Sequence, residues 1–136
     1  LIKPAAPQNA IEEYLSLTEH SLRFSVNFRF NTGSVALDNR ALADVNRLAK
    51  FIEEEKLEHC NLKLLGFSDK FGSAADNWKI SRTRARIVAN TIAEKANVNI
   101  QEVKGFGHTM PVASNATSQG RLKNRRVEVW ISCPSE

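Results

Sequence analysis

The sequence predicts an α/β fold: a two-layer β-α-β-α-β-β sandwich with a mixed four-stranded sheet and its helices on one face. Apolar side chains recur at every second position over residues 22–30 and 127–131, which is the period of a strand. Two longer segments between them have the period of an amphipathic helix. The chain has 136 residues, which is enough for one compact domain and too few for two ordinary ones.

The first strand and the first long helix have the clearest patterns. Residues 22–30 alternate apolar and polar side chains, as a half-buried strand does, and the segment Asn31-Thr32-Gly33-Ser34 ends the alternation. Asp38 is a good N-cap for the helix that follows, and the apolar face of that helix ends at Ile52.

The second half of the chain repeats this order. Residues 62–65 are predicted to form a strand, and the polar loop 66–73 leads to a helix over residues 77–96. Residues 103–106 form a third strand, and residues 107–124 are predicted to be a loop before the final strand. The β-α-β crossovers are right-handed and put both helices on one face, whereas the long loop lets the final strand return antiparallel.

The two ends of the chain are predicted to lie outside the main domain. Residues 1–20 read as a linker and a short helix, residues 21–133 as the domain and residues 134–136 as a C-terminal tail. No apolar run of about 18 residues appears, so we expect no membrane span in this segment. Because the chain starts at Leu1 rather than Met, we expect it to be part of a longer protein.

Composition and charge are those of an ordinary globular domain, with 42% hydrophobic and 25% charged residues. The formal net charge of +4 favours anionic partners such as nucleic acid, anionic lipid or carboxylate-rich polymers. A charge of this size is equally usual in a domain that is simply soluble. Charge alone therefore leaves both interpretations open, and the sequence indicates no particular oligomeric state.

The cysteines and histidines do not have the spacing of a metal site. Cys60 and Cys133 contain no C-x-x-C pair, and His20, His59 and His108 are scattered along the chain. We therefore expect neither a metal nor a cofactor. The two cysteines either form one disulfide in an oxidising compartment or remain two buried thiols.

Four polar residues are candidates for a binding site. Asn77, Ser81 and Arg84 have the spacing i, i+4, i+7 and lie on one stripe of the second helix. Asp69 lies in the loop before that helix, so a carboxylate and a guanidinium flank the same region. This combination suits a zwitterion, because the carboxylate takes an ammonium and the guanidinium holds a carboxylate by two parallel bonds. The alternative is that Asp69 and Arg84 pair with each other.

At this point the sequence resembles a known family. The resemblance lies in a series of short motifs in register over about residues 22–132: Gly66-Phe67-Ser68-Asp69, Gly72-Ser73, Asn77, Ile80-Ser81, Arg84-Ala85, Val88, Gly105-Phe106-Gly107, Pro111-Val112-Ala113-Ser114-Asn115, Thr117, Gly120-Arg121 and Asn124-Arg125-Arg126-Val127-Glu128. This series resembles the OmpA C-terminal domain family. So many matches in order are far more specific than a single glycine motif.

The resemblance implies a β-α-β-α-β-β domain that binds peptidoglycan without cutting it, in the periplasm of a Gram-negative cell envelope. In that family the residues at the positions of Asp69 and Arg84 clasp the free end of meso-diaminopimelate in the stem peptide. The positions of Asn77 and Asn31 line the same groove, and Ser81 completes the set of ligand-binding residues that we expect. The family topology also places the last strand beside the second, which brings Cys60 and Cys133 to one edge of the sheet and favours the disulfide.

Three residues depart from the family pattern. Phe67 replaces the usual histidine, Ser68 replaces the usual threonine, and Arg29 stands where an acid is frequent. Phe67 is expected to keep its packing and Ser68 keeps a hydroxyl, so we expect the groove to survive. The affinity for the cell wall is the property that these changes put in doubt.

Two other classes of function are alternatives. A nucleic-acid-binding domain would use cations and stacking rings: Arg82, Arg84, Arg86, Lys123, Arg125 and Arg126, with Phe67 and Phe71. Its affinity would fall steeply with salt. An enzyme such as an amidase would need metal ligands or an activated nucleophile, and Ser68, Asp69 and His108 lack the G-x-S-x-G motif of a nucleophile elbow. We therefore expect a non-catalytic protein that does not bind nucleic acid.

The host protein is a separate question. The segment 27–38 is similar to OmpA-like domains fused behind a periplasmic substrate-binding domain of phosphate-transport type. Flagellar stator proteins and lipoproteins carry the same kind of domain.

Overall fold

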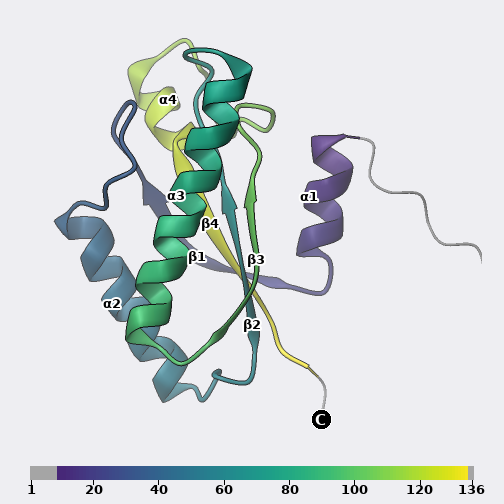
Figure 1. The fold of residues 1–136 in the computed structure, drawn as a ribbon, viewed down its shortest axis with the longest axis vertical. Helices are drawn as coiled ribbons and strands as arrows, with labels where there is room; N and C mark the ends of the chain where they lie inside the picture. Colours follow the sequence, from purple (N-terminus) through teal and green to yellow (C-terminus); the bar gives the residue numbers. More distant parts are fainter. Residues whose placement is uncertain (1–8, 135–136) are drawn as a thin grey trace, which may run out of the picture.

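The four strands form one mixed sheet in the order β1-β4-β2-β3 (Figure 1). The structure is a computed structural model that describes residues 9–134. The strands are β1 (Leu22–Arg29), β2 (Asn61–Gly66), β3 (Asn99–Gly105) and β4 (Arg126–Ser132). The last strand, β4, lies between β1 and β2 and is antiparallel to both, whereas β2 and β3 are parallel. The predicted mixed sheet and the return of the last strand are confirmed.

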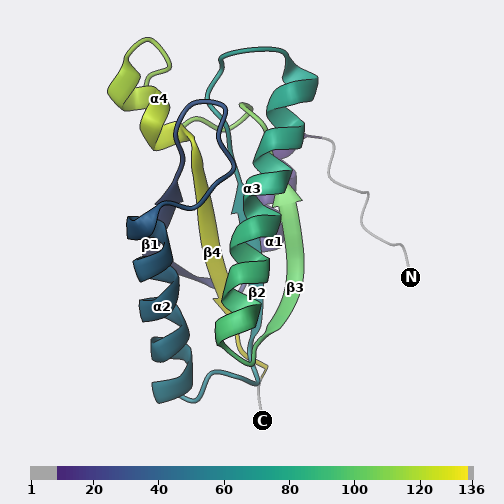
Figure 2. The same ribbon diagram turned by 60° about the vertical axis from the view of Figure 1, so that its left-hand side comes forward.

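Two long helices cover one face of this sheet, as the sequence predicted (Figure 2). They are α2 (Asn39–Glu54) and α3 (Ala74–Lys95). The side chain of Asp38 accepts a hydrogen bond from the Ala41 amide and caps α2, which confirms the predicted N-cap. Ser73 caps α3 in the same way, so α3 begins one turn before the predicted start at Asn77.

The main core lies between these two helices and the sheet. Its fully buried side chains come from all the elements that face this layer: Phe28, Val45, Ile52, Leu62, Leu64, Val88, Ile92, Val127 and Val129. Burying side chains of this size stabilises a fold by about 1.5–3 kcal/mol each before conformational entropy is subtracted. This core packs α3 against β2 and β3.

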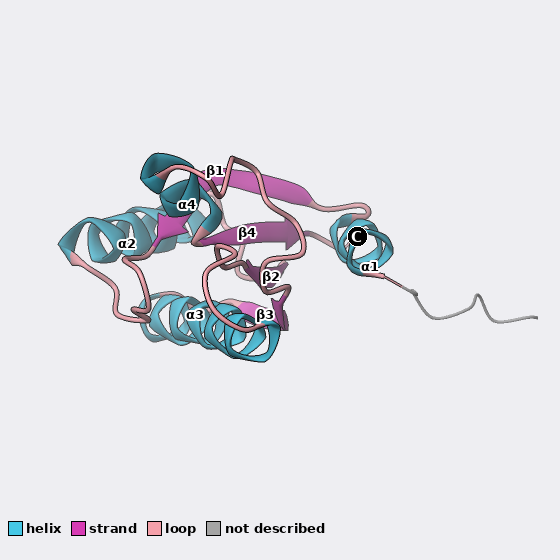
Figure 3. Ribbon diagram, turned by 90° about the horizontal axis from the view of Figure 1, so that it is seen from above, coloured by secondary structure: helices cyan, strands magenta, loops and turns pink. Residues whose placement is uncertain are grey.

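A short helix, α1 (Ala10–Thr18), lies on the opposite face of the sheet (Figure 3). Its Tyr14 ring meets the rings of Phe67, Phe106 and Trp130 edge to face, with centroids about 6 Å apart. The predicted short helix is therefore present, and it covers apolar side chains that the sheet exposes on this side. The linker predicted before it falls largely on residues 1–8, outside the described residues. Within residues 9–134 no helix combines the length and the apolar character that crossing a membrane requires.

A buried acid lies beneath α1. Glu128 is 1% exposed and accepts hydrogen bonds from the Tyr14 hydroxyl (2.8 Å), the Trp130 ring nitrogen (3.1 Å) and Arg126 Nε (2.9 Å). The Arg126 guanidinium lies over the Phe67 ring, 3.8 Å from its centroid. This cluster gives the carboxylate the partners that a buried charge needs, and Tyr14 is the partner supplied by α1.

The predicted loop over residues 107–124 is wrong at its end, where the chain forms α4 (Ser118–Asn124). Thr117 caps this helix by accepting from the Gly120 amide. Gly120 is buried in α4 and lies so close to the Ser114 carbonyl that a Cβ at this position would collide with it, so the helix requires glycine there. Asn124 then hydrogen-bonds the backbone of Val112 and Ala113, which ties the preceding loop to the C-terminal end of α4.

Cys60 and Cys133 form a disulfide, as the family topology favoured. Their neighbours Asn61 and Ser132 are paired across β2 and β4, so the two cysteines follow at the same edge of the sheet, with Cα atoms 4.2 Å apart. The bond closes a sequence separation of 73 residues and ties the start of β2 to the end of β4.

Replacing both cysteines, Cys60→Ser with Cys133→Ser, is expected to destabilise the fold. A loop of this length contributes up to about 4 kcal/mol in the chain-entropy model, because the disulfide restricts the unfolded chain. Urea unfolding of the oxidised wild type and the double variant measures the difference. Chemically reduced wild type is the control and should resemble the variant; equal free energies of unfolding for all three would contradict a stabilising disulfide.

Tyr14, the single tyrosine, is expected to titrate abnormally. Burial first, and then the hydrogen bond to Glu128, raise the pKa of Tyr14 to about 12. The raised pKa means that the neutral phenol adds stability at neutral pH, and that this stability is lost as the pH rises from about 10 to about 12. Phenolate absorbance of the folded protein measures the titration, and the same protein in denaturant is the control. A folded-state midpoint equal to the denatured one would show that α1 does not dock as described.

Candidate ligand-binding site

A pocket of about 250 Å³ opens where the loops after β1 and β2 meet the first turns of α3. These segments lie together at one end of the sheet (Figure 1). The pocket is lined by side chains from both loops, from α3 and from the residue before β4: Thr32, Gly33, Ser68, Asp69, Phe71, Asp76, Asn77, Ile80, Arg84 and Arg125. It therefore combines residues that are far apart in the sequence.

Asp69 is the buried acid of this pocket and is 5% exposed. One carboxylate oxygen accepts from the Phe71 amide at 3.0 Å, and the other accepts from Arg125 Nη1 at 2.7 Å. An ionised carboxylate has about four acceptor positions, so both oxygens keep capacity for a further donor. Asp69 can thus receive an ammonium group without losing the two bonds that orient it.

Arg84 is the largest fully buried side chain and is 1% exposed. Its Nε donates to the Ser34 carbonyl at 2.9 Å, its Nη2 donates to the Asn31 carbonyl at 3.2 Å, and its Cζ lies over the Phe30 ring, 5.0 Å from the centroid. Among the described residues, no carboxylate pairs with it and Nη1 has no hydrogen-bond partner. A guanidinium has five N–H groups, so Nη1 and the second hydrogen of Nη2 remain for a ligand carboxylate.

Arg125 is the second buried guanidinium. Its Nε donates to the Phe30 carbonyl at 2.7 Å while Nη1 pairs with Asp69. Burial lowers the pKa of Arg84 to about 10, and the nearby charge of Arg125 adds to this effect while Asp69 opposes it. The pocket therefore contains two buried guanidinium groups and only one buried carboxylate, that of Asp69. A ligand carboxylate beside Arg84 would restore the balance.

The remaining walls complete the pocket. Asn77 is buried, and its amide nitrogen lies 3.1 Å from His108 Nδ1, which fixes the amide plane. Asp76, in the first turn of α3, adds a second acidic residue to the lining. Phe71 and Ile80 supply apolar surface. The arrangement suits a ligand with a short aliphatic stem that carries both an ammonium and a carboxylate.

The structure brings three of the five predicted residues into this pocket: Asp69, Asn77 and Arg84. The other two lie elsewhere. The Ser81 hydroxyl donates to the Trp78 carbonyl and accepts from the Gly107 amide, so it joins α3 to the loop after β3. The Asn31 side chain is exposed and lines a neighbouring pocket, and its contribution here is the carbonyl that holds Arg84.

Sequence reasoning missed Arg125 and Asp76. The alternative that Asp69 pairs with Arg84 is wrong, because Asp69 pairs with Arg125. The available signal was the position of Arg125 directly before a strand that lies between β1 and β2. Because β4 is antiparallel to β1 and β2, the residue before β4 lies between the loop that follows β1 and the loop that follows β2.

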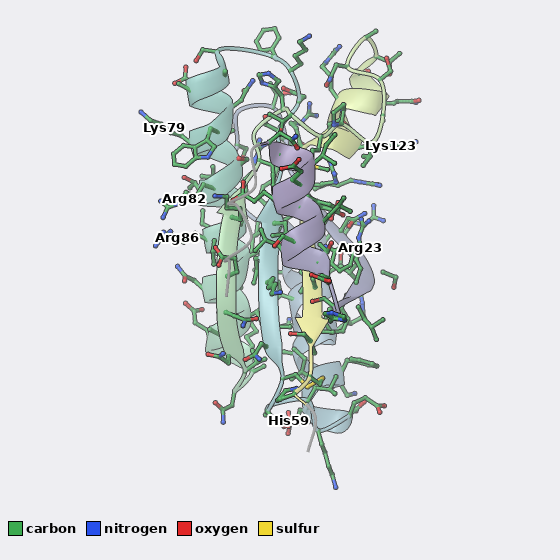
Figure 4. All side chains as sticks on the ribbon, turned by 90° about the vertical axis from the view of Figure 1, so that its right-hand side faces the viewer. Arg23, His59, Lys79, Arg82, Arg86 and Lys123 are labelled. Carbon is green, nitrogen blue, oxygen red and sulfur yellow. A yellow bond between two sulfur atoms is a disulfide. The ribbon has the colours of Figure 1, made fainter. Side chains whose placement is uncertain are left out.

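Half of the cations that a nucleic-acid-binding site would use are not accessible to a ligand at the surface. Three of the six are buried: Arg84, Arg125 and Arg126. Phe67 is also fully buried and cannot stack on a base. Figure 4 shows Arg82 and Arg86 projecting on one side of the molecule and Lys123 on the other. The remaining cations therefore do not form one continuous patch in this view, which weighs against an extended polyanion site.

One histidine does lie close to two sulfur atoms. The ligand atoms of His59, Cys60 and Cys133 all lie within 4.8 Å of one another. Both sulfurs are bonded to each other in the disulfide, however, and a disulfide sulfur is not the thiolate that a metal site requires. The cluster is therefore a disulfide with a neighbouring imidazole.

The fold is that of a small α/β domain whose candidate ligand pocket lies among the loops at one end of a mixed sheet. The model of the OmpA family matches residues 29–125, and the chain belongs to this family.

Two curated relatives have informative names. Outer membrane porin F of Pseudomonas aeruginosa is 29% identical over 117 residues, which are 85% of this chain and 33% of that protein. The peptidoglycan-binding protein ArfA of Mycobacterium bovis is 39% identical over 93 residues, which are 65% of this chain and 27% of that protein. The chain therefore spans about a third or less of the length of these relatives.

Solved structures share the fold. The C-terminal domain of Helicobacter pylori MotB superposes with a TM-score of 0.71 at 25% identity, covering 81% of this chain and 86% of that one. The peptidoglycan-associated lipoprotein from Burkholderia pseudomallei gives a TM-score of 0.69 at 18% identity, covering 78% and 89%.

A double-mutant cycle is expected to show strong coupling between Asp69 and Arg125. Breaking a buried pair from either side leaves an unpaired charge and costs about 3–5 kcal/mol, so the two alanine variants should each be destabilised. The double variant should lose less than their sum, by about 1–3 kcal/mol. Denaturant unfolding measures the cycle, and a parallel cycle of Asp69 with the exposed Arg86 should be additive. Additivity for Asp69 with Arg125 would mean that the pair is not formed.

Proposed function

We propose that the pocket binds the diaminopimelate end of the peptidoglycan stem peptide and so attaches its host protein to the cell wall. Asp69, with Asp76 nearby, receives the ammonium group. Arg84 holds the carboxylate through Nη1 and Nη2, and Asn77 lines the space between the two. The observation that carries the proposal is that Arg84 is buried at the pocket with no carboxylate of its own among the described residues.

The comparisons support this ligand class. The chain belongs to the OmpA family, and one relative is named a peptidoglycan-binding protein. The structure named peptidoglycan-associated lipoprotein shares the fold. These names favour the cell wall over other polymers that carry ammonium and carboxylate groups.

The domain binds without cleaving. The Ser68 hydroxyl donates to the Asp69 carbonyl, and the His108 ring contacts the Asn77 amide, so these contacts do not join the serine to the histidine as a nucleophile and its base. The groups of the pocket are oriented to hold opposite charges. The proposed outcome of binding is retention of the ligand and not its hydrolysis.

The proposed location is the periplasm. Peptidoglycan lies there in Gram-negative cells, and an oxidising compartment is where the Cys60–Cys133 disulfide persists. Residues 21–133 are the proposed wall-binding domain, residues 1–20 its linker and short helix, and residues 134–136 a tail. The host protein contributes whatever activity the anchor positions.

The charge of Asp69 and the paired donors of Arg84 are expected to be necessary for retention on diaminopimelate-type peptidoglycan. Asp69→Asn keeps an acceptor for the Phe71 amide, and Arg84→Lys keeps a cation but loses the paired donors. Each should weaken binding at least tenfold, because losing one partner of a desolvated charge pair costs about 2–5 kcal/mol. Co-sedimentation with purified peptidoglycan measures binding, and Arg86→Ala, an exposed arginine two residues along the same helix, is the matched control.

The wall chemistry provides a second arm of this experiment. Peptidoglycan with lysine in place of diaminopimelate lacks the carboxylate, so wild type should bind it clearly more weakly, and free diaminopimelate should release the protein from its own wall type. Folded Asp69→Asn and Arg84→Lys proteins that bind like wild type, or equal binding to both wall types, would refute the clasp.

A further inference from the structure

A second groove opens on another side of α3, between this helix, α1 and the end of β3. Its volume is about 310 Å³, and its lining residues come from these three elements and the loop after β3: Asn9, Ala10, Glu13, Trp78, Lys104, Gly105, Phe106 and Thr109. None of these residues lines the pocket that contains Asp69 and Arg84. The groove is therefore a separate feature of the surface.

The most prominent wall of this groove is an exposed indole. Trp78 is 47% exposed. The Arg82 guanidinium lies over this ring, with its Cζ 5.9 Å from the ring centroid. The second tryptophan, Trp130, behaves differently, because its nitrogen is bonded to Glu128 and its ring packs on Tyr14. Of the two, only Trp78 presents a large flat apolar surface to a ligand.

The rest of the groove is polar. Lys104 Nζ and a Glu13 carboxylate oxygen form an ion pair of 2.6 Å across it, joining β3 to α1. The Thr109 hydroxyl donates to the Phe106 carbonyl and keeps its lone pairs for a donor. A flat aromatic surface beside an acid, a base and a hydroxyl matches a pyranose ring, whose C–H face is apolar and whose rim carries hydroxyl and amide groups.

The groove and the pocket share a rigid piece of backbone. Asn77 lines the pocket and Trp78, the next residue of α3, lines the groove. Gly107 adopts a positive φ of 60° and packs against this backbone, where an added Cβ would lie 3.4 Å from the Trp78 nitrogen. The two sites are thus held in a fixed relation at the first turns of α3. A single ligand with a sugar and a zwitterion on one flexible peptide is the partner that would use both.

We propose that the Trp78 groove binds a sugar ring of the glycan strand from which the stem peptide branches. The indole stacks on the C–H face of the ring, and Glu13, Lys104 and Thr109 bond its rim. The inference rests on the proposed function, because the stem peptide held at Asp69 and Arg84 brings its own sugar to α3. The Trp78 groove would then bind the glycan while the pocket with Asp69 and Arg84 binds the peptide.

The test compares two soluble ligands: the diaminopimelate-containing stem peptide alone, and the same peptide carrying its N-acetylglucosamine–N-acetylmuramic acid disaccharide. Calorimetry with the full chain is expected to show that the disaccharide tightens wild-type binding by about tenfold, the scale of one aromatic stacking contact with its rim bonds. Trp78→Ala should remove this gain and leave binding of the free peptide unchanged. Phe51→Ala, at an aromatic residue of similar exposure on α2 (45%), is the matched control and should keep the gain.

A Trp78→Ala protein that keeps the full gain would overturn the glycan subsite, as would a wild type that shows no gain. If the free peptide fails to bind wild type, the proposed binding of diaminopimelate by Asp69 and Arg84 is wrong, and binding of the disaccharide alone then tests the Trp78 groove. In that case a change of tryptophan emission on adding the disaccharide, present in wild type and absent in Trp78→Ala, supports the subsite. Identical emission in wild type with and without the disaccharide rejects it.

Discussion

The strand β4 forms hydrogen-bonded ladders with β1 on one side and β2 on the other, and the site depends on this placement. The pairing continues past the strand, where the Phe30 amide donates to the Arg125 carbonyl and the Phe67 amide donates to the Arg126 carbonyl. The loops after β1 and β2 are therefore held on either side of Arg125. Without β4 between them, the Phe30 carbonyl and the Asp69 carboxylate would not meet the same guanidinium.

The alternation of a strand then distributes two adjacent arginines to opposite faces of the sheet. Arg125 turns toward the pocket and pairs with Asp69, whereas Arg126 turns beneath α1 and pairs with Glu128. Each acid is almost completely buried and has hydrogen bonds beyond its arginine. These two adjacent arginines thus organise both the pocket that contains Asp69 and the contact that holds α1 to the sheet.

Local patterns in the sequence predicted the individual elements, and the family resemblance supplied the pairing of the last strand with the second and favoured the disulfide, but neither identified the partner of Asp69. The alternation over residues 22–30 and the Asp38 cap identify their elements because strand period and N-cap chemistry are local properties. The partner of Asp69 is 56 residues away, and its choice of Arg125 over Arg84 follows from strand order, which no local period encodes. Helix α4 escaped prediction because Gly120 has low helix propensity and is required there by its close approach to Ser114.

The position of the last strand within the sheet also determines the order in which the domain can fold during synthesis. A chain emerging from its N-terminus brings Asp69 and Arg84 out first, but the cation that orients Asp69 arrives more than fifty residues later. Cys133 comes directly after β4, so the disulfide with Cys60 can form only once all four strands of the sheet have been synthesised. The biosynthetic order therefore makes the Asp69–Arg125 pair one of the last features of the pocket to form, and a nascent or clipped chain that lacks Arg125 and β4 cannot form it.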